Sequence, residues 1–268
     1  MSVPFEADAL VKRSRRRWPE TTPRVKRSDT PGPMIKAILF DFGQTLVDSA
    51  DGFRTAEKEA QRKLHAALSR VPWGDFIERY RGIRKAFHDR SEFSRVAIWQ
   101  AVFDSLGQEG EGPALERWEE EYWTTVNRRT VLFPEAAEVL GKLAVDYRLA
   151  LVTNTQGQVK SEAHRLSEFP VLERAFETIV VAGARGIEPK PDPRPFRLCL
   201  ARLDLSAAEA VFVGDDYRID VCGAIDVGMR SIWLKHRSVE RSWPSVSATV
   251  PVIHGLDELL DLDRALAS

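Results

Sequence analysis

The chain has few cysteines, no long hydrophobic run and almost no net charge, and each of these absences excludes a class of protein. Cys199 and Cys222 are the only two cysteines in 268 residues, and they are not spaced as metal ligands are. No uninterrupted apolar stretch approaches the roughly 18 residues of a membrane span, and the N-terminus lacks the apolar region of a secretory signal. A formal net charge of -1 excludes a generally basic nucleic-acid binder. We therefore expect a cytoplasmic protein with no membrane partner and without nucleic acid as its main partner.

The composition is ordinary apart from residues 1–33. Apolar residues make up 43% of the chain and charged residues 29%, as in other globular proteins, and the length allows one large domain or two small ones. Residues 1–33 are rich in Arg, Lys, Pro and Thr without a lasting hydrophobic period, so we predict a basic, disordered extension. Two other interpretations stay open: the arm binds nucleic acid or anionic lipid, or the native protein begins at Met34, directly before the first convincing strand.

From Ile35 onward, short apolar runs alternate with helical patterns. We expect strands at 35–40, 148–153, 178–181, 210–213, 230–234 and 250–253, and helices near 134–144, 158–168, 193–203 and 219–227. Near-continuous apolar strands separated by helices are typical of an α/β fold whose parallel sheet is covered on both faces. The sequence thus predicts such a core from residues 34–49 and 132–268, with ligands beyond the carboxyl ends of its strands.

Residues 50–131 interrupt this alternation, because they contain no clear strand. Their apolar residues fall into three stripes at helical spacing: Ala60, Leu64, Ala67 and Leu68; Val96, Trp99, Val102, Phe103 and Leu106; and Leu115, Trp118, Tyr122 and Val126. An all-helical insertion directly after the first strand is expected to form a cap, or lid, over the strand ends. Its basic residues could meet a second anionic group of a substrate, although we expect a solvated helix face for each: Arg79, Arg81, Arg84, His88 and Arg95.

Polar side chains follow the predicted strands in a consistent order. Asp41 ends the first apolar run, Thr153 and Asn154 end the second, and Lys190 lies just before a predicted helix. The strand at 210–213 is followed by three acids, Asp215, Asp216 and Asp220. Each group alone is ordinary, since such residues are common as caps and in turns. All of them together, each after a strand and in this order, indicate one site.

Such a site has the groups that phosphoryl transfer requires. The carboxylates of Asp41 and Asp215 can hold Mg²⁺, which prefers oxygen ligands, and the backbone carbonyl of Gly43 could add a third oxygen. With the phosphate charge neutralised, Asp41 could attack it and form an aspartyl phosphate. The Thr153 hydroxyl, the backbone N–H groups that follow it and the Lys190 ammonium could bind the other phosphate oxygens.

Four motifs carry a resemblance to a known family: Asp41-Phe42-Gly43-Gln44-Thr45-Leu46-Val47-Asp48-Ser49, Leu151-Val152-Thr153-Asn154, Lys190-Pro191-Asp192-Pro193, and Gly214-Asp215-Asp216-Tyr217-Arg218-Ile219-Asp220. With these motifs the chain resembles the haloacid dehalogenase-like hydrolase superfamily, in particular its phosphatases with a helical cap. The resemblance implies a Rossmann-like core, Mg²⁺ dependence, a mobile cap and a small phosphorylated metabolite as substrate; it leaves the oligomeric state open.

The same resemblance assigns roles to individual residues. It implies that Asp41 is the nucleophile, that Thr153, Asn154 and Lys190 bind the substrate phosphate, and that Asp215 binds the metal. Asp220, or alternatively Asp216, supports the ion or Lys190.

Two departures from the family pattern affect these expectations. Pro189 lengthens the loop before Lys190 by one residue, which would shift the lysine slightly. In most of the phosphatases the first motif reads Asp-x-Asp-Gly-Thr, and its second Asp protonates the leaving oxygen and then activates water. Here Gly43 stands at that position.

The missing acid leaves two alternatives open beside the phosphatase. One is a phosphate-binding or scaffolding member with impaired turnover, against which the other intact site residues argue. The other is a 2-haloacid dehalogenase. The dehalogenases of the superfamily also lack this acid, but they do not use an acidic cluster in the fourth motif.

Without its second acid, the enzyme is expected to favour good leaving groups. General acid–base catalysis contributes a factor of about 10²–10⁴, or roughly 3–5 kcal/mol of barrier. Its loss weighs most on alkyl phosphates, whose leaving alkoxide needs a proton, and less on aryl or acyl phosphates. We predict higher specific activity on aryl phosphates than on simple sugar phosphates, and, from the sequence alone, a gain on alkyl phosphates in Gly43→Asp. Equal activity on both ester classes would contradict the bias.

Overall fold

The structure is a computed structural model that describes residues 34–158, 165–239, 242–246 and 250–267. The basic extension expected over residues 1–33 lies outside the described residues, as do residues 159–164 of the expected helix at 158–168. None of the described helices combines the length and the apolar character that crossing a membrane requires.

Six parallel strands form the central sheet, as the sequence predicted. The strands are β1 (Ala37–Phe40), β4 (Arg148–Asn154), β5 (Thr178–Ala182), β6 (Ala210–Gly214), β7 (Arg230–Leu234) and β8 (Val252–Ile253). Their order in the sheet is β5-β4-β1-β6-β7-β8, so β1 lies between β4 and β6. The carboxyl ends of these three neighbours therefore meet at one edge of the sheet.

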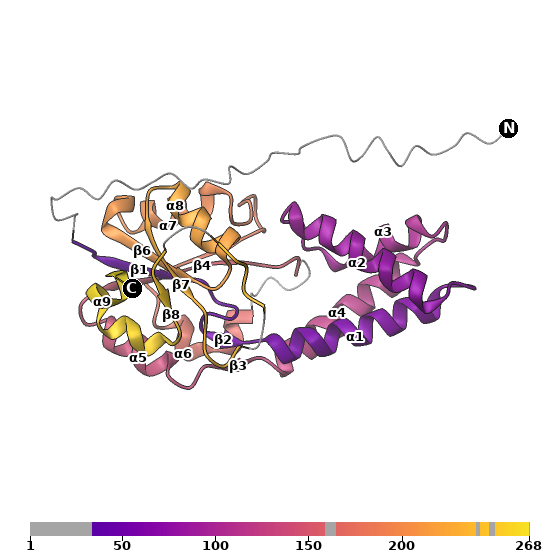
Figure 1. The fold of residues 1–268 in the computed structure, drawn as a ribbon, viewed down its shortest axis with the longest axis horizontal. Coiled ribbons are helices and arrows are strands. Elements are labelled where there is room, and N and C mark those ends of the chain that lie inside the picture. The colour runs from indigo at the N-terminus through magenta and orange to yellow at the C-terminus, as the bar shows by residue number, and fades with distance from the viewer. Residues whose placement is uncertain (1–33, 159–164, 240–241, 247–249, 268) are drawn as a thin grey trace.

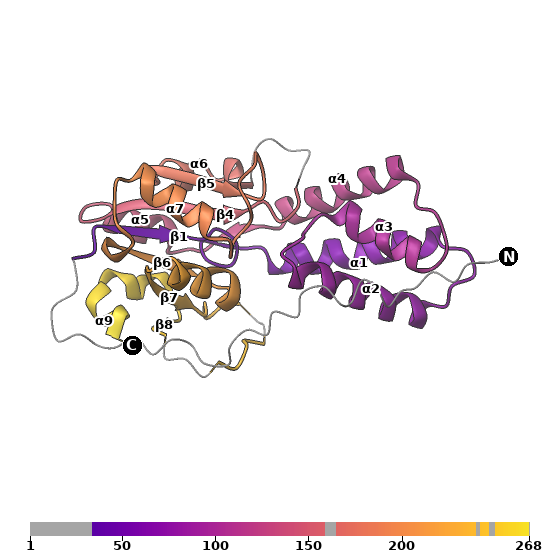
Figure 2. The same ribbon diagram turned by 90° about the horizontal axis from the view of Figure 1, so that it is seen from above.

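Helices cover both faces of the sheet (Figures 1 and 2). Successive side chains of a strand point to opposite faces, and β1 is apolar on both. Ile38 and Phe40 belong to a hydrophobic cluster that includes residues of α5, α6 and α9, whereas Ala37 and Leu39 belong to a second cluster with residues of α7 and α8. These helices are α5 (Ala136–Leu143), α6 (Pro170–Glu173), α7 (Pro193–Arg202), α8 (Gly223–Asp226) and α9 (Leu262–Ala267).

Among the described residues, four 3-10 or π-helical segments complete this part of the fold. They are the 3-10 turns η1 (Arg165–Glu168), η2 (Ala207–Glu209) and η4 (Leu256–Leu260), and the π-helix η3 (Tyr217–Cys222). The helix expected at 219–227 thus begins two residues earlier, as η3, and continues into α8. Only the last turn of the helix expected at 158–168 falls within the described residues, as η1.

Between the first and second strands of the sheet, four helices form an insertion with a hydrophobic cluster of its own (Figure 1). They are α1 (Ala50–Ala67), α2 (Trp73–Asp89), α3 (Arg95–Ser105) and α4 (Gly112–Arg128). Leu64, Trp99 and Tyr122, one from each predicted stripe, are buried there. Ala67, the last residue of α1, is exposed, contrary to the first stripe, whereas Ala60, Leu64 and Leu68 are buried as predicted.

A two-stranded antiparallel ribbon joins the insertion to the core, and the sequence analysis did not foresee it. Its strands are β2 (Val47–Asp48) and β3 (Val131–Leu132), each too short to show an alternating pattern. The Phe133 N–H donates to the Leu46 carbonyl at 3.0 Å, which extends the contact. The chain therefore enters and leaves the insertion at one place, beside the end of β1.

The loop between α2 and α3 contacts the carboxyl edge of the sheet. The guanidinium of Arg218, in η3, donates to the carbonyl of His88 at 3.2 Å and to the Ser91 hydroxyl at 3.3 Å. Gly157, which follows β4, packs against the same loop with φ of +84°; an added Cβ would lie 2.1 Å from the Phe93 carbonyl oxygen. Two segments of the core thus hold the insertion over the strand ends.

Candidate active site

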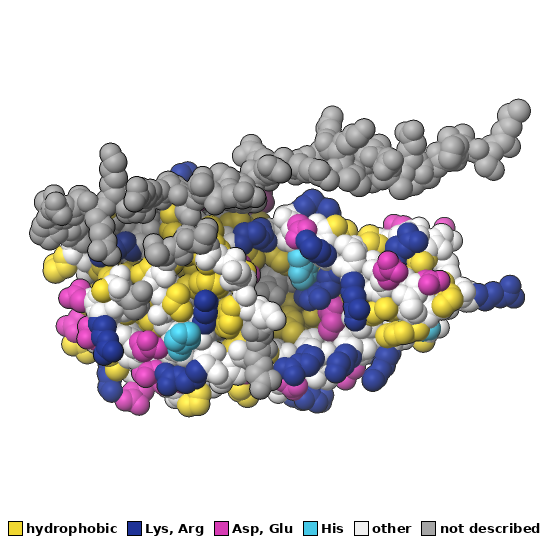
Figure 3. Space-filling model, in the orientation of Figure 1, with side chains coloured by type: hydrophobic (Ala, Val, Ile, Leu, Met, Phe, Trp, Pro, Cys, Tyr) yellow, Lys and Arg dark blue, Asp and Glu magenta, His cyan; other side chains and the backbone are white. Residues whose placement is uncertain are grey.

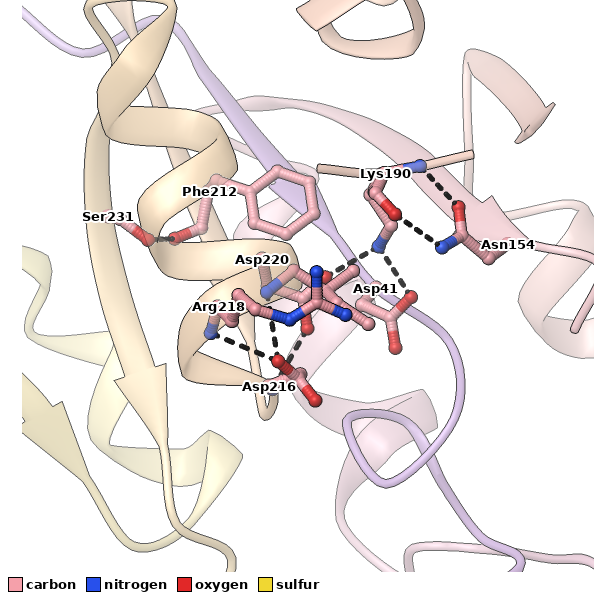
Figure 4. A network of polar contacts seen from close by, with 9 residues as sticks. Asp41, Asn154, Lys190, Phe212, Asp216, Arg218, Asp220 and Ser231 are labelled. Atoms are coloured by element: carbon pink, nitrogen blue, oxygen red, sulfur yellow. Dashed lines mark hydrogen bonds and ion pairs between the residues drawn. The ribbon is translucent and has the colours of Figure 1, made fainter. Parts of the chain in front are cut away.

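The predicted site residues converge at the edge where β4, β1 and β6 end. Asp41 follows β1, and its N–H donates to the Val213 carbonyl of β6 at 2.9 Å. Asn154 ends β4 and Asp215 follows β6. Lys190 reaches the same place from the loop before α7 (Figure 4). The extra residue Pro189 therefore does not remove the lysine from the site.

Lys190 forms two ion pairs in the interior of the protein. Its side chain is 1% exposed, and its Nζ atom lies 2.8 Å from Asp41 Oδ1 and 2.6 Å from Asp220 Oδ1. Burial lowers the pKa of Lys190, but the two carboxylates more than offset it, so the pKa lies above its ordinary value. The ammonium stays charged and draws Asp41 and Asp220 together.

The Asn154 side chain holds the backbone of Lys190. Its Oδ1 accepts the Lys190 N–H at 2.8 Å and its Nδ2 donates to the Lys190 carbonyl at 3.0 Å. Both groups of the amide are thereby used in positioning the lysine (Figure 4). The phosphate-binding role that the sequence analysis gave to Asn154 stays a prediction, and it falls on the backbone rather than on this side chain.

Three carboxylates lie close together beside the lysine. Asp41, Asp215 and Asp220 each offer an oxygen, and these oxygens all lie within 4.8 Å of one another. Burial raises the pKa of Asp220 above its ordinary value; the Lys190 ammonium opposes this shift, while the charges of Asp41 and Asp216 add to it. Repulsion among buried acids of this kind is relieved by a bound cation.

The acid cluster fits a hard divalent cation. Its donors are carboxylate oxygens, which Mg²⁺ prefers, and three such groups exceed the single positive charge of Lys190. Asp216 lies outside the cluster and instead caps η3, accepting the N–H groups of Arg218 and Ile219 at 3.0 and 2.9 Å. Of the two acids that the sequence left as alternatives, Asp220 is the one beside Lys190.

The loop after Asp41 folds back on itself. The Phe42 carbonyl accepts the Leu46 N–H at 2.9 Å, and Gln44 takes a positive φ of 60°. This tight turn brings Gly43 to the wall of the cavity. The role of its carbonyl as a metal ligand remains a prediction.

A cavity of about 400 Å³ opens in front of Asp41, between the sheet edge and the insertion. On the insertion side it is lined by Phe53, Arg84, His88, Asp89, Phe93 and Arg95, so three of the basic residues named from the sequence border a cavity. Figure 3 shows basic side chains on the insertion where it borders the core. Burial, followed by the charges of Arg95 and Arg84, lowers the pKa of His88 to about 3, so this imidazole is neutral.

Arg79 and Arg81 have the solvated position that was expected for them, because they are exposed on α2 and do not line this cavity. Thr153 is 3% exposed within β4, one residue before the cavity wall, and its hydroxyl is still expected to bind phosphate.

One buried residue near the site, Arg165, was not predicted from the sequence. Its Nη1 donates to the buried Ser49 hydroxyl at 3.0 Å. No local pattern indicates this pair, because 116 positions separate its members.

Comparison with known proteins places this fold and site in a family. The family model of haloacid dehalogenase-like hydrolases matches residues 35–228, most of the chain. The chain is a haloacid dehalogenase-like hydrolase. This match confirms the resemblance drawn from the four motifs.

Several relatives within this hydrolase family are phosphatases. A phosphoserine phosphatase from Thermus thermophilus is 29% identical over 210 residues, covering 75% of this chain and 82% of the relative. A phosphoglycolate phosphatase from Salmonella typhimurium is 28% identical over 215 residues, with the same coverage of 75% and 82%. The hydrolase described here is accordingly phosphatase-like.

Solved structures show the same architecture. The HAD-hydrolase YfnB from Bacillus subtilis superposes with a TM-score of 0.60 at 21% identity, covering 86% of this chain and 99% of its own. A 2-haloacid dehalogenase from Pseudomonas syringae superposes with a TM-score of 0.58 at 28% identity, covering 87% and 99%. The fold is therefore shared by phosphatases and dehalogenases, and the site residues must distinguish them.

The two hydrogen bonds between the Asn154 side chain and the Lys190 backbone form a clamp, and this clamp gives a prediction for stability. Asn154→Ala leaves the buried N–H and carbonyl of Lys190 without their partners, so we expect a loss of about 1–3 kcal/mol in the free energy of unfolding. Thr155→Ala is the matched control, because its hydroxyl makes only long contacts, 3.4 and 3.5 Å, and its loss should stay below about 0.5 kcal/mol. Urea denaturation measures both. Equal losses in the two variants would show that the clamp contributes nothing.

Proposed function

We propose that this hydrolase is a Mg²⁺-dependent phosphomonoesterase that transfers the phosphoryl group of a small metabolite to Asp41. One observation carries the proposal: the Asp41 carboxylate lies at a cavity wall, 2.8 Å from a buried ammonium and beside two further buried acids. A nucleophilic carboxylate needs its attacking oxygen oriented and the charge of the phosphate offset. This cluster supplies both.

Each residue of the cluster has a separate task in this reaction. Lys190 holds Asp41 through Oδ1, which leaves Oδ2 as the proposed attacking atom, and its ammonium, at the cavity wall, is proposed to neutralise phosphate oxygens. Asp220 keeps the lysine charged and in place, since its Oδ1 lies 2.6 Å from Nζ. The Thr153 hydroxyl and the N–H of Asn154 are proposed to donate to the phosphate.

Asp41, Asp215 and Asp220, with the carbonyl of Gly43, are the groups proposed to hold the metal. When bound, Mg²⁺ supplies positive charge that neutralises the phosphate and orients it toward the nucleophile. The carbonyl of Asp215 accepts the Trp233 Nε1–H at 2.9 Å, which fixes the backbone that carries its carboxylate. Turnover ends when water attacks the phosphoryl group on Asp41 and releases the carboxylate.

The acidic cluster favours phosphoryl transfer over dehalogenation. A haloacid substrate carries less negative charge than a phosphate monoester, and it does not require a divalent cation beside the nucleophile. Asp41, Asp215 and Asp220 would then form a cluster of acids beside the single ammonium of Lys190 with no cation to balance the excess, and burying unbalanced charge is costly. Gly43 fits either chemistry, so the support for phosphoryl transfer comes from the acid cluster.

Removing the nucleophile tests this function most simply. Asp41→Asn should lower Mg²⁺-dependent hydrolysis of p-nitrophenyl phosphate by at least about 10³-fold, as for other lost nucleophiles. Chelation of the metal with EDTA should abolish the activity of the unaltered protein, and added Mg²⁺ should restore it.

Asp51→Asn serves as the matched control, because this acid is exposed on α1 and pairs with Arg129 at the surface. It should keep full activity. If metal-dependent hydrolysis survives in Asp41→Asn, another group is the nucleophile; chloride release from 2-chloropropionate without Mg²⁺ would indicate a dehalogenase instead.

The basic wall of the cavity supports a substrate with a second anionic group. Arg84 and Arg95 face the cavity from α2 and α3, and His88 between them is neutral. The Nε atom of Arg95 has no hydrogen-bond partner within the described part of the chain, although it is buried. Buried donors of this kind are normally paired, so a carboxylate or second phosphate of the substrate is proposed to accept from this wall.

Substitution of Arg84, on α2, tests whether the cavity binds a second anionic group of the substrate. Arg84→Gln should raise KM about tenfold for phosphate esters that carry a carboxylate, since a charged hydrogen bond is lost. KM for p-nitrophenyl phosphate, which has no second anion, should change little. Arg79→Gln is the control on the exposed face of the same helix. An equal rise of KM for both kinds of ester in Arg84→Gln would contradict the proposal.

A further inference from the structure

Arg165 lies beside the position where the first motif lacks its second acid. The side chain is buried, with 4% exposed, and it belongs to none of the four motifs. A Cβ added at Gly43 would lie 3.6 Å from its Nη2 atom. Because a carboxylate group would extend beyond that Cβ, the guanidinium borders the space that an aspartate side chain would occupy.

The guanidinium is held in one orientation. Nη1 donates to Ser49 Oγ at 3.0 Å, and Ser49 is fully buried. The guanidinium carbon lies 5.5 Å from the centre of the Phe42 ring and 5.2 Å from that of Phe53. Gly43 and Phe53 line the cavity, so Arg165 stands directly behind its wall. A donor fixed before the reaction needs no reorganisation during it.

Arg165 is also charged. Burial lowers the pKa of this guanidinium to about 10, and Asp41 opposes the shift, so the group keeps its proton at neutral pH. Among the described residues outside 42–44, only Arg165 comes within 4 Å of a Cβ added at Gly43, so no other side chain fills the space between the guanidinium and this glycine. Gly43 therefore has two consequences: the site lacks a second acid, and the space beside Arg165 is left unfilled.

We propose that Arg165 stabilises the leaving oxygen of the substrate through the gap at Gly43. The bond from the Asp41 oxygen to phosphorus forms while the ester P–O bond breaks, and the electron pair of that bond stays on the leaving oxygen. The guanidinium donates a hydrogen bond to the resulting alkoxide and keeps its own proton. The alkoxide takes a proton from water as it leaves. This inference rests on the proposed phosphatase function.

Dependence on the leaving group tests the proposal. The measurement is kcat/KM for a series of aryl and alkyl phosphates that differ in the pKa of the leaving alcohol. Arg165→Met should lower kcat/KM about 10²-fold for alkyl esters and less than tenfold for p-nitrophenyl phosphate, as expected for a lost donor to a developing oxyanion. Arg165→Lys, which keeps the charge, should recover part of the alkyl activity. Arg174→Met, at an exposed arginine after α6, should leave the whole series unchanged.

A second substitution keeps the test independent of whether Arg165→Met folds. In Gly43→Asp the new carboxylate would form an ion pair with Arg165 and fill the gap, so kcat/KM for alkyl esters should fall. This reverses the gain that the sequence alone led us to expect.

Two outcomes would overturn the proposal. One is a loss in Arg165→Met that is the same for every ester, since that would indicate a structural role; the other is a rise in alkyl activity in Gly43→Asp. If the unaltered protein hydrolyses no phosphate ester with Mg²⁺, the proposed function itself fails, which is distinguishable from a series that Arg165 does not affect.

Discussion

The buried ammonium of Lys190 is the interaction on which the site depends. It joins a residue after β1, a residue of η3 and the loop before α7, with both ion-pair distances under 3 Å, at 2.8 and 2.6 Å. Breaking one side of a buried ion pair leaves an unpaired charge and typically costs about 3–5 kcal/mol. The Asn154 amide, at the end of β4, holds the backbone of Lys190, and β1 next to β4 places Asp41 beside the ammonium.

Positive charge around Asp41 comes from three directions. Lys190 lies on one side, Arg165 lies behind Gly43, and Arg84 and Arg95 face the cavity from the insertion. The negative groups Asp215 and Asp220 lie together beside the lysine, where a cation fits. This separation of charges suits a substrate that is strongly anionic at the phosphate and anionic again at its far end. The loop held by Arg218 and Gly157 encloses that space.

Much of this could be predicted from the sequence, because strand ends are local features. Apolar runs ending in Asp41, Asn154 and Asp215 predicted the sheet and the edge where its site lies. The two-residue strands β2 and β3 were missed because alternation needs more residues to be visible. The Asn154 clamp and the Arg165–Ser49 pair were missed because they join segments 36 and 116 positions apart, and only the folded chain brings them together. Ala67 was misplaced because helical spacing does not say which residues of the last turn of a helix remain exposed.

The central claim is that Asp41 is the group that receives the phosphoryl group. Its most direct test is acid quenching of the enzyme during turnover of a phosphate-labelled ester with Mg²⁺, followed by peptide mapping of the label. The account predicts label on the peptide that contains Asp41, stable in acid, released by hydroxylamine, and absent in Asp41→Asn. Turnover without any labelled protein, or label on another residue, would contradict it.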